Sequence, residues 1–397
     1  MHLKKQSRRN FLKTAGVGIT CLPLAFSALA ANNLKSKKKP FMVYVGTYAK
    51  PDAPNIFLYR LHATTGELTR INAFKGGENP SFLALTSDQQ YLYAVNEVID
   101  FNGVKTGAVS AFAVDKKTGD LTFLNQLATG GSAPCYVSVD KSGKLVLVAN
   151  YVGGNVIMFP IQTSGRLGNF TALQQHQGSG PDAKRQEAPH AHCIIPTPDN
   201  QFALAVDLGI DKIKNYRLDT KQGGLVPNPG ADFSTRPGAG PRHLTFHPNG
   251  RYAYLITELN STLMVLAYNS HNGSFTALQT ISTLPASFKG ENIGADVHVS
   301  PNGKFLYASN RGHNSLVVFS INAGTGKLNL VEHVDTQGNW PRNFGLDPSG
   351  TFLVVANQYS NNMVSYHVDN QTGKLKPTGF TAEVSAPVCI LLVPAFS

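Results

Sequence analysis

Residues 240–259 read GPRHLTFHPNGRYAYLITEL and have the pattern of one β-hairpin. The turn is Pro-Asn-Gly at 248–250, because proline presets φ at a turn corner while Asn and Gly tolerate positive φ. The flanking runs alternate or are continuously apolar, as strands do. Gly250 lies midway between Arg242 and Glu258, and residues equidistant from a hairpin turn face each other. A base and an acid are therefore expected to meet at the open end.

The same hairpin recurs along the chain, and its copies are Asn79–Glu97, Ala133–Tyr151, Ala191–Leu208, Gly240–Glu258, Gly294–Arg311 and Trp340–Gln358. A seventh copy is divided between the ends of the chain. Ser385–Leu391 has the first strand, and Phe41–Tyr48 has the second. Pairing of these two segments would complete the last unit and close a ring.

A small-Gly-x-apolar turn marks the same units, at Gly66, Gly119, Gly165, Gly223, Gly273, Gly326 and Gly373. Each turn follows an alternating strand, and the strands are Ile56–Leu61, Val109–Val114, Val156–Ile161, Ile213–Leu218, Leu263–Tyr268, Leu316–Ile321 and Met363–Val368.

Seven all-β units of about 50 residues, without capping repeats, favour a β-propeller over an open solenoid. We predict one seven-bladed β-propeller over residues 40–397, with four-stranded blades and a ring closed by the N- and C-terminal strands. The only long interruption, Gln174–Pro189, is rich in Gly, Pro and charge and is expected to be a loop on one face.

The leader carries most of the net charge of +11. Nine positive residues and no acid precede residue 40, so the remaining chain is near +2 and gives no nucleic-acid footprint. Ser7–Lys13, with Arg8 and Arg9, followed by an apolar run to Ala30, resembles a twin-arginine signal peptide over residues 1–31. A linker at 32–39 follows. The prediction is periplasmic export by the twin-arginine translocase, and the alternative is an uncleaved membrane anchor.

The cysteines show no metal-binding spacing. Cys21 falls in the leader, and Cys135, Cys193 and Cys389 are isolated, so three buried free thiols are expected. No His, Asp or Glu cluster has a convincing metal spacing either, and we predict no cofactor.

The register of the hairpins gathers polar residues at one mouth of the channel. If the first strand of each blade lines the channel, its start and the end of the second strand lie at the same mouth. The second strands end at Tyr48, Glu97, Tyr151, Leu208, Glu258, Arg311 and Gln358. The first strands start at Ser81, Cys135, His192, Arg242, Ala295, Arg342 and Val388.

Arg242 with Glu258 could be a simple cross-strand ion pair. Arg311 and Arg342 at the same mouth favour an anion site instead, because like charges around a channel need compensation and guanidinium forks suit carboxylate or phosphate. His190 and His192 alternate, so at most one faces the channel, and register favours His192.

Three further histidines are interpreted as structural or as lying off the site. His243 should face away from Arg242 toward the neighbouring blade. His247 and His298 should lie near turns at the opposite mouth or between blades. Asp296 and Glu291 are near the functional mouth in an uncertain register.

These residues, with the block GPDAKRQEAPHAH at 180–192 and HVSPNGKFLYASNR at 298–311, resemble the seven-bladed β-propeller lactonase family. That family includes a bacterial 6-phosphogluconolactonase and fungal carboxymuconate-cyclising enzymes. The resemblance spans nearly all of the chain after the leader. It implies hydrolysis of a sugar or sugar-acid lactone without a metal, or the related cycloisomerisation of a muconate-type acid.

The resemblance implies catalytic roles for His192, Arg242, Glu258 and Arg311, and His190 competes for the histidine's role. Glu258 or His192 would be the base that deprotonates water, and Arg242 or Arg311 would stabilise the oxyanion. Arg342 would bind the substrate's carboxylate or phosphate, with Glu97 and Gln358 completing the substrate-binding set.

The expected ligand is an anionic lactone or carboxylate, and the mature protein is not expected to be embedded in a membrane. Export argues against a phosphorylated cytoplasmic substrate. A periplasmic propeller that binds a ligand or protein without turnover is the remaining alternative.

Overall fold

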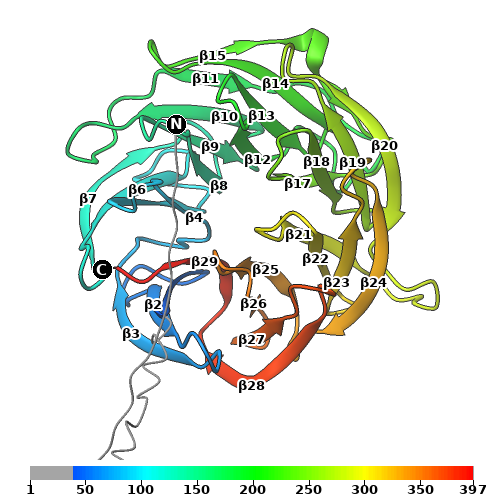
Figure 1. The fold of residues 1–397 in the computed structure, drawn as a ribbon. Helices are drawn as coiled ribbons and strands as arrows, with labels where there is room; N and C mark the ends of the chain where they lie inside the picture. Colours follow the sequence, from blue (N-terminus) through cyan, green and yellow to red (C-terminus); the bar gives the residue numbers. More distant parts are fainter. Residues whose placement is uncertain (1–38, 397) are drawn as a thin grey trace, which may run out of the picture. The chain divides into compact units, whose positions relative to one another are not determined.

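The computed structural model of the chain describes residues 39–396, and the expected signal peptide lies outside the described residues. The strands form seven antiparallel sheets arranged around a central channel (Figure 1). Each sheet contains four strands in series, and one sheet gains a fifth short strand. The predicted seven-bladed β-propeller is confirmed.

The innermost strands line the channel and contact one another between blades: β4 (Leu83–Leu85), β8 (Pro134–Val139), β12 (Ala191–Pro196), β17 (Pro241–Phe246), β21 (Ile293–Val299), β25 (Pro341–Leu346) and β29 (Pro387–Pro394). The second strands are β5 (Tyr91–Asn96), β9 (Leu145–Asn150), β13 (Phe202–Asp207), β18 (Tyr252–Thr257), β22 (Phe305–Arg311), β26 (Phe352–Asn357) and β1 (Phe41–Thr47).

The third strands are β6 (Ala108–Val114), β10 (Asn155–Pro160), β14 (Lys212–Asp219), β19 (Thr262–Tyr268), β23 (Ser315–Ile321), β27 (Asn362–Val368) and β2 (Ile56–Leu61). The outer strands are β7 (Leu121–Ala128), β11 (Ala172–Gln175), β15 (Gly224–Pro227), β20 (Phe275–Ser282), β24 (Leu328–Asp335), β28 (Leu375–Glu383) and β3 (Leu68–Phe74). A short helix η1 (Pro229–Ala231) precedes β16 (Phe233–Ser234), which pairs with β14.

The two ends of the described chain close the ring as predicted. Strand β29 pairs antiparallel with β1, with Ile390 opposite Val45. One sheet therefore takes its inner strand from the C-terminal end and its other three strands from the N-terminal end.

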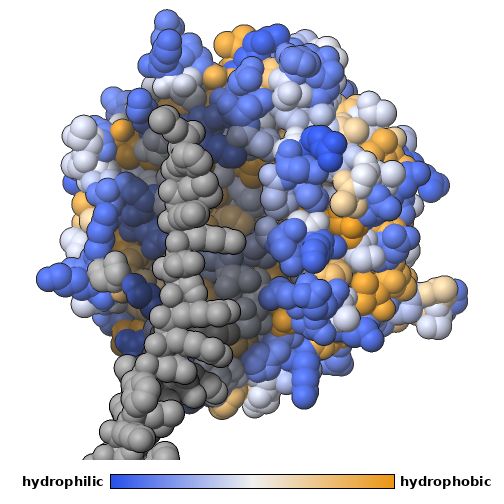
Figure 2. Space-filling view, in the orientation of Figure 1, coloured by the Kyte–Doolittle hydropathy of each residue, from blue (hydrophilic) through white to orange (hydrophobic). Residues whose placement is uncertain are grey.

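The hydrophobic core is divided among the interfaces between neighbouring blades. The second strands are buried almost throughout, and each of the seven apolar clusters draws side chains from two adjacent blades. The face shown in Figure 2 is largely hydrophilic, with apolar residues in scattered patches. The scaffold is thus a closed ring with apolar interfaces between its blades, and the polar residues that can form a site lie at the strand ends and in the loops.

The recurring glycine turns serve both conformation and packing. Gly119 and Gly326 have φ values of 81° and 71°, in the left-handed region that favours glycine. Tyr44 donates a hydrogen bond of 2.6 Å to the carbonyl of Gly119, and Tyr254 donates one of 3.0 Å to that of Gly326. Each bond joins the second strand of one blade to the turn of the next.

A β-bulge at the start of the inner strands corrects the expected hairpin register. In the opening hairpin Pro241 pairs with Thr257 and His243 pairs with Ile256, so Arg242 is the extra residue of the bulge and has no direct partner across the hairpin. Irregularities at the same point skip Cys135, His192, Ala295 with Asp296, Arg342 and Val388 in five of the other blades. Bulges re-aim side chains. With Arg242, six of the seven predicted strand-start residues of the mouth lie at such irregularities, and the exception is Ser81.

Candidate active site

The residues at one mouth of the channel line a cavity of about 450 Å³. Six of the eight residues predicted for the site lie on its wall: Glu97, His192, Glu258, Arg311, Arg342 and Gln358. The other two, Arg242 and His190, lie behind the wall. The register argument therefore brought most of the set together, although the bulges change how the side chains are presented.

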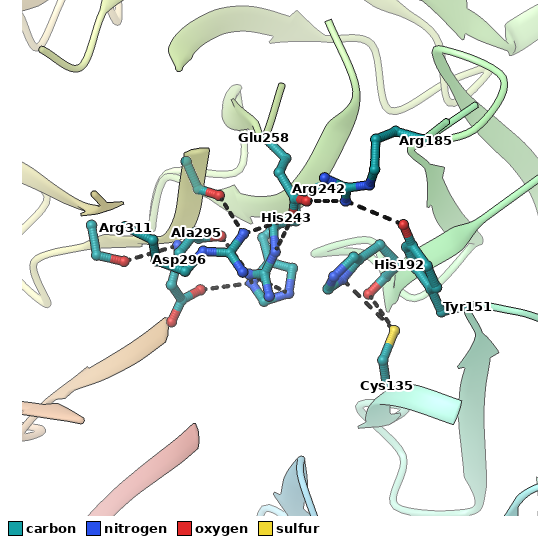
Figure 3. Close-up of polar contacts among 12 residues, drawn as sticks. Cys135, Tyr151, Arg185, His192, Arg242, His243, Glu258, Ala295, Asp296 and Arg311 are labelled. Atoms are coloured by element: carbon teal, nitrogen blue, oxygen red, sulfur yellow. Dashed lines mark hydrogen bonds and ion pairs between the residues drawn. The ribbon is translucent and has the colours of Figure 1, made fainter. Parts of the chain in front are cut away.

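Glu258 is the centre of the site and binds three arginines. Its Oε2 accepts hydrogen bonds from Arg242 Nε at 3.0 Å and from Arg311 Nη2 at 2.7 Å. Its Oε1 accepts from Arg185 Nη2. Figure 3 shows Arg185 on one side of Glu258 and Arg311 on the other. The expected contact between Arg242 and Glu258 is confirmed, and it belongs to a larger cluster.

The electrostatics of this cluster fix the ionisation of Glu258. Burial alone would raise its pKa, but Arg311, Arg242 and Arg185 outweigh burial and hold the pKa well below its usual range. Burial lowers the pKa of Arg311 to about 9 despite the attraction of Glu258. Glu258 is therefore a carboxylate with both oxygens occupied, which is a poor arrangement for accepting a proton.

Arg242 supports the site from behind the cavity wall. Only 2% of it is exposed, and its Nη1 donates a hydrogen bond of 2.6 Å to the carbonyl of Ala295 in the next blade. The side chain thus links Glu258 to the neighbouring inner strand. Of the two arginines proposed from sequence for the oxyanion, Arg311 is the one that lines the cavity.

His192 is a buried, neutral histidine on the cavity wall. Its Nδ1 lies 3.7 Å from Cys135 Sγ, and its Nε2 has no hydrogen-bond partner among residues 39–396. Burial, reinforced by Arg242, His243 and Arg342, holds the pKa of His192 well below its ordinary value. A neutral imidazole that lines a cavity and has an unpaired ring nitrogen can accept a proton from water.

His192 rather than His190 lines the cavity, as the register favoured, and His190 lies behind Tyr151. Its ring stacks on the Tyr151 ring with centroids 4.5 Å apart, and its Nδ1 lies 3.0 Å from the Tyr151 carbonyl. Tyr151 in turn meets His192 edge to face at 5.5 Å. His190 therefore supports the wall of the cavity through Tyr151.

The opposite wall carries an arginine that is not ion-paired. Arg342 has no hydrogen bond or salt bridge within the described part of the chain, and its guanidinium carbon lies 5.3 Å from the Tyr48 ring centroid. Glu97 accepts hydrogen bonds from Tyr48 at 2.8 Å and Ser81 at 2.6 Å. Gln358 Oε1 is buried without a partner in residues 39–396. This wall offers both donors and acceptors to a ligand.

The prediction that His243 faces away from Arg242 is wrong. His243 Nε2 lies 3.3 Å from Arg242 Nη1, because the bulge at Arg242 breaks the strict alternation of the strand. His243 does reach the neighbouring blade, where its Nδ1 binds Asp296 at 2.8 Å. Burial, with Arg242 beside it, lowers the pKa of His243 to about 4.

Asp296 joins three blades beneath the mouth. It binds His298 Nε2 at 2.8 Å and accepts a hydrogen bond from Asn343 Nδ2 at 2.5 Å, in addition to His243. His298 meets Phe344 of the next blade, and His247 binds the carbonyl of Gly303 at 2.9 Å. The interpretation of His247 and His298 as residues between blades agrees with these contacts.

Sequence reasoning missed Arg185. It lies in the loop after β11, and register arguments address only strand ends. The sequence feature that could have indicated Arg185 is the loop that contains it. The loop Gln174–Pro189 is the one long interruption of the repeat, and it faces the mouth. Trp340 and Tyr359 were also missed; their rings stack 4.9 Å apart at the cavity edge.

Cys135, Cys193 and Cys389 are buried and free, as predicted. Within residues 39–396 no group of three or more His, Cys, Asp or Glu side chains could hold a metal ion. The same part of the chain contains no helix with the length and apolar character of a membrane span.

Comparison with known proteins adds the following similarities. The profile of a family described as "Lactonase, 7-bladed beta-propeller" matches residues 42–392. The 6-phosphogluconolactonase of Bacillus subtilis is 40% identical over 307 residues, which cover 77% of this chain and 85% of the relative. The 6-phosphogluconolactonase of Formosa agariphila is 37% identical over 312 residues, 77% of this chain and 86% of the relative.

Among solved structures, the periplasmic gluconolactonase of Pseudomonas aeruginosa superposes with a TM-score of 0.83 at 33% identity, covering 90% of this chain and 99% of the other.

Proposed function

The chain belongs to the seven-bladed β-propeller lactonase family, and from this premise we propose that it hydrolyses a lactone at the Glu258 mouth of its channel. The observation that carries the proposal is the cavity itself: a neutral histidine, His192, and three arginines, Arg185, Arg311 and Arg342, line a space of about 450 Å³. That space suits a small ring-shaped substrate.

In this mechanism His192 is the general base. Its free Nε2 takes a proton from a water molecule as the water oxygen attacks the lactone carbonyl carbon. The ring C–O bond then breaks, and His192 returns the proton to the departing ring oxygen. Glu258, whose two oxygens are engaged by guanidinium groups, holds the arginines in place.

Arg342 is assigned to the anionic group of the substrate. The mouth contains Arg185, Arg242, Arg311 and Arg342 against Glu97 and Glu258, which leaves an excess of two positive charges. Arg342 has no hydrogen bond or salt bridge to any residue that the structure describes. A phosphate or carboxylate there would compensate the excess.

Replacing Arg342 with Ala should raise KM for an anionic lactone by about 10- to 100-fold, the worth of a charge-assisted hydrogen bond. KM for an uncharged lactone should change less than threefold. The comparison uses 6-phosphogluconolactone against gluconolactone, with Arg217→Ala, an exposed arginine on β14, as the control. An equal rise for both substrates would show that Arg342 does not read the anion.

The activity itself is tested with purified protein and sugar lactones, using acid release in a pH-stat after correction for spontaneous hydrolysis. Acid release well above that background supports lactonase activity. Conversion of a muconate-type acid alone would support the cycloisomerase alternative. Tight anion binding without turnover of either class would support a binding protein.

We also propose that the protein is exported to the periplasm. The support is the Arg8-Arg9 leader and the similarity to a solved periplasmic gluconolactonase. Replacing both leader arginines with Lys should leave the protein in the cytoplasmic fraction, while the unchanged chain should be found in the periplasmic fraction. Equal distribution of the two would contradict export by this route. A periplasmic location would favour an unphosphorylated lactone as substrate.

A further inference from the structure

The loop between β11 and β12 is fixed at both ends by one buried carboxylate. His176 Nδ1 lies 2.6 Å from Asp207 Oδ2 near its start, and both side chains are buried. Near its end the backbone N–H of His190 donates a hydrogen bond of 2.7 Å to Asp207 Oδ1. Because Asp207 ends β13, the whole loop is attached to the rigid second strand of the next blade.

Within the loop, a tight turn sets the position of Arg185. Asp182 Oδ1 accepts hydrogen bonds from the backbone N–H groups of Lys184 at 2.9 Å and Arg185 at 3.2 Å. Gln186, which is fully buried, donates a hydrogen bond of 2.8 Å to the carbonyl of Leu208. The backbone of Arg185 is therefore built into place before any ligand arrives.

The side chain of Arg185 reaches over Glu258 and keeps free donors. Its Nη2 bonds to Glu258 and lies 3.3 Å from the Tyr151 hydroxyl. Its Nε and Nη1 have no partner within residues 39–396. The side chain is 37% exposed and lines the cavity, in contrast to Arg242 at 2%. In Figure 3, Arg185, Tyr151 and His192 lie on the same side of Glu258.

Positive charge is in excess around Glu258, because three guanidinium groups bond to one carboxylate. Arg242 and Arg311 are buried and both bond to Oε2 of Glu258, so the single negative charge is already shared between them. Arg185 is the most exposed of the three and the one added from a loop. A preorganised positive charge, in a site from which water is partly excluded, stabilises the negative charge that develops there during a reaction.

We propose that Arg185 is a catalytic residue that stabilises the oxyanion formed when water adds to the lactone carbonyl. The inference rests on the lactone hydrolysis proposed above. As the water oxygen bonds to the carbonyl carbon, the C=O π pair moves onto the carbonyl oxygen, and the free N–H groups of Arg185 donate to it. The pair returns when the ring C–O bond breaks, and the ring oxygen takes the proton held by His192. Tyr151 contacts both Arg185 and His192 and so fixes the positions of these two side chains relative to each other.

The test is Arg185→Ala, with gluconolactone and 6-phosphogluconolactone as substrates. We expect kcat to fall by about 10²- to 10³-fold on both, the range for loss of one oxyanion donor, with little change in KM. Added guanidinium ion should restore part of kcat, which loss of a merely structural contact would not allow. Lys184→Ala, at the exposed neighbouring position of the same turn, is the matched control and should retain the original kcat.

Other results of these measurements would overturn the inference about Arg185, and they distinguish its failure from failure of the proposed function. A rise in KM for the phosphorylated lactone alone would make Arg185 an anion-binding residue and overturn the inference. An equal loss in Lys184→Ala, or a lowered Tm in Arg185→Ala without guanidinium rescue, would assign the effect to the loop. An unchanged kcat in Arg185→Ala overturns the inference alone, whereas an unmodified protein that hydrolyses no lactone overturns the proposed function with it.

Discussion

Replacing Glu258 with Gln should cost about 3–5 kcal/mol of unfolding free energy, the range for breaking a buried ion pair by removing one partner. Arg242 and Arg311 would remain buried, at 2% and 3% exposure, without their shared carboxylate. The kcat/KM for the best lactone should fall by about 10³-fold or more, because the arginines that face the substrate would lose their positions. Denaturant unfolding and steady-state kinetics measure the two effects.

Glu97→Gln is the matched control for Glu258→Gln. Glu97 lines the same cavity, but its hydrogen-bond partners are the hydroxyls of Tyr48 and Ser81, so no arginine loses its only ion pair. Its loss should cost about 1–2 kcal/mol at most. Inorganic phosphate should stabilise Glu258→Gln more than the unmodified protein, since an anion can replace the missing charge. Equal stability losses in the two variants would contradict the central role of Glu258.

The same substitution predicts a pH dependence with a definite sign. Glu258 has a lower pKa in the folded protein than its unfolded value of about 4.3. Its contribution to stability is therefore fully present above that value and is lost as the pH falls below it. The stability difference between the unmodified protein and Glu258→Gln should be constant above about pH 5.5 and should shrink below about pH 4. A difference that grew in acid would contradict the pKa direction.

The fold could be predicted from the sequence because each copy of the repeated unit gives separate evidence for the same period. Seven glycine turns and six hairpins constrain one another, and the split seventh copy predicted the pairing of β1 with β29. Single strand bounds came out within one or two residues, as Ile56–Leu61 shows for β2.

The site was only partly predictable, for reasons of local geometry. Strict alternation placed Arg242 and His243 on opposite sides, and the bulge between Pro241 and His243 put them in contact. A bulge at the strand start has no clear sequence signal of its own. Arg185 comes from a loop, where position depends on tertiary anchors such as Asp207, and those anchors are visible only after folding.

The identity of the base turns on His192, and replacing it with Ala should lower kcat by about 10²- to 10⁴-fold, the usual worth of a general base. The free Nε2 on the cavity wall is lost, whereas His190→Ala removes a ring that contacts the site only through Tyr151 and should lower kcat less than about tenfold. Added imidazole should restore part of the activity of His192→Ala. Comparable losses in both variants, with no rescue, would contradict the assignment.

The pH profile of the unmodified enzyme gives a second test of His192 as the general base. Since burial and the neighbouring arginines hold the pKa of His192 well below 6.5, the base stays neutral in the free enzyme, and kcat/KM should show no acid limb near the ordinary histidine pKa. An anionic substrate compensates Arg342 and Arg242, so the pKa of His192 should rise in the complex. The acid limb of kcat should then lie at higher pH than that of kcat/KM, and only for anionic lactones. Coincident acid limbs for charged and uncharged lactones would show that the arginines do not control the pKa of the base. The base would then be a group other than His192.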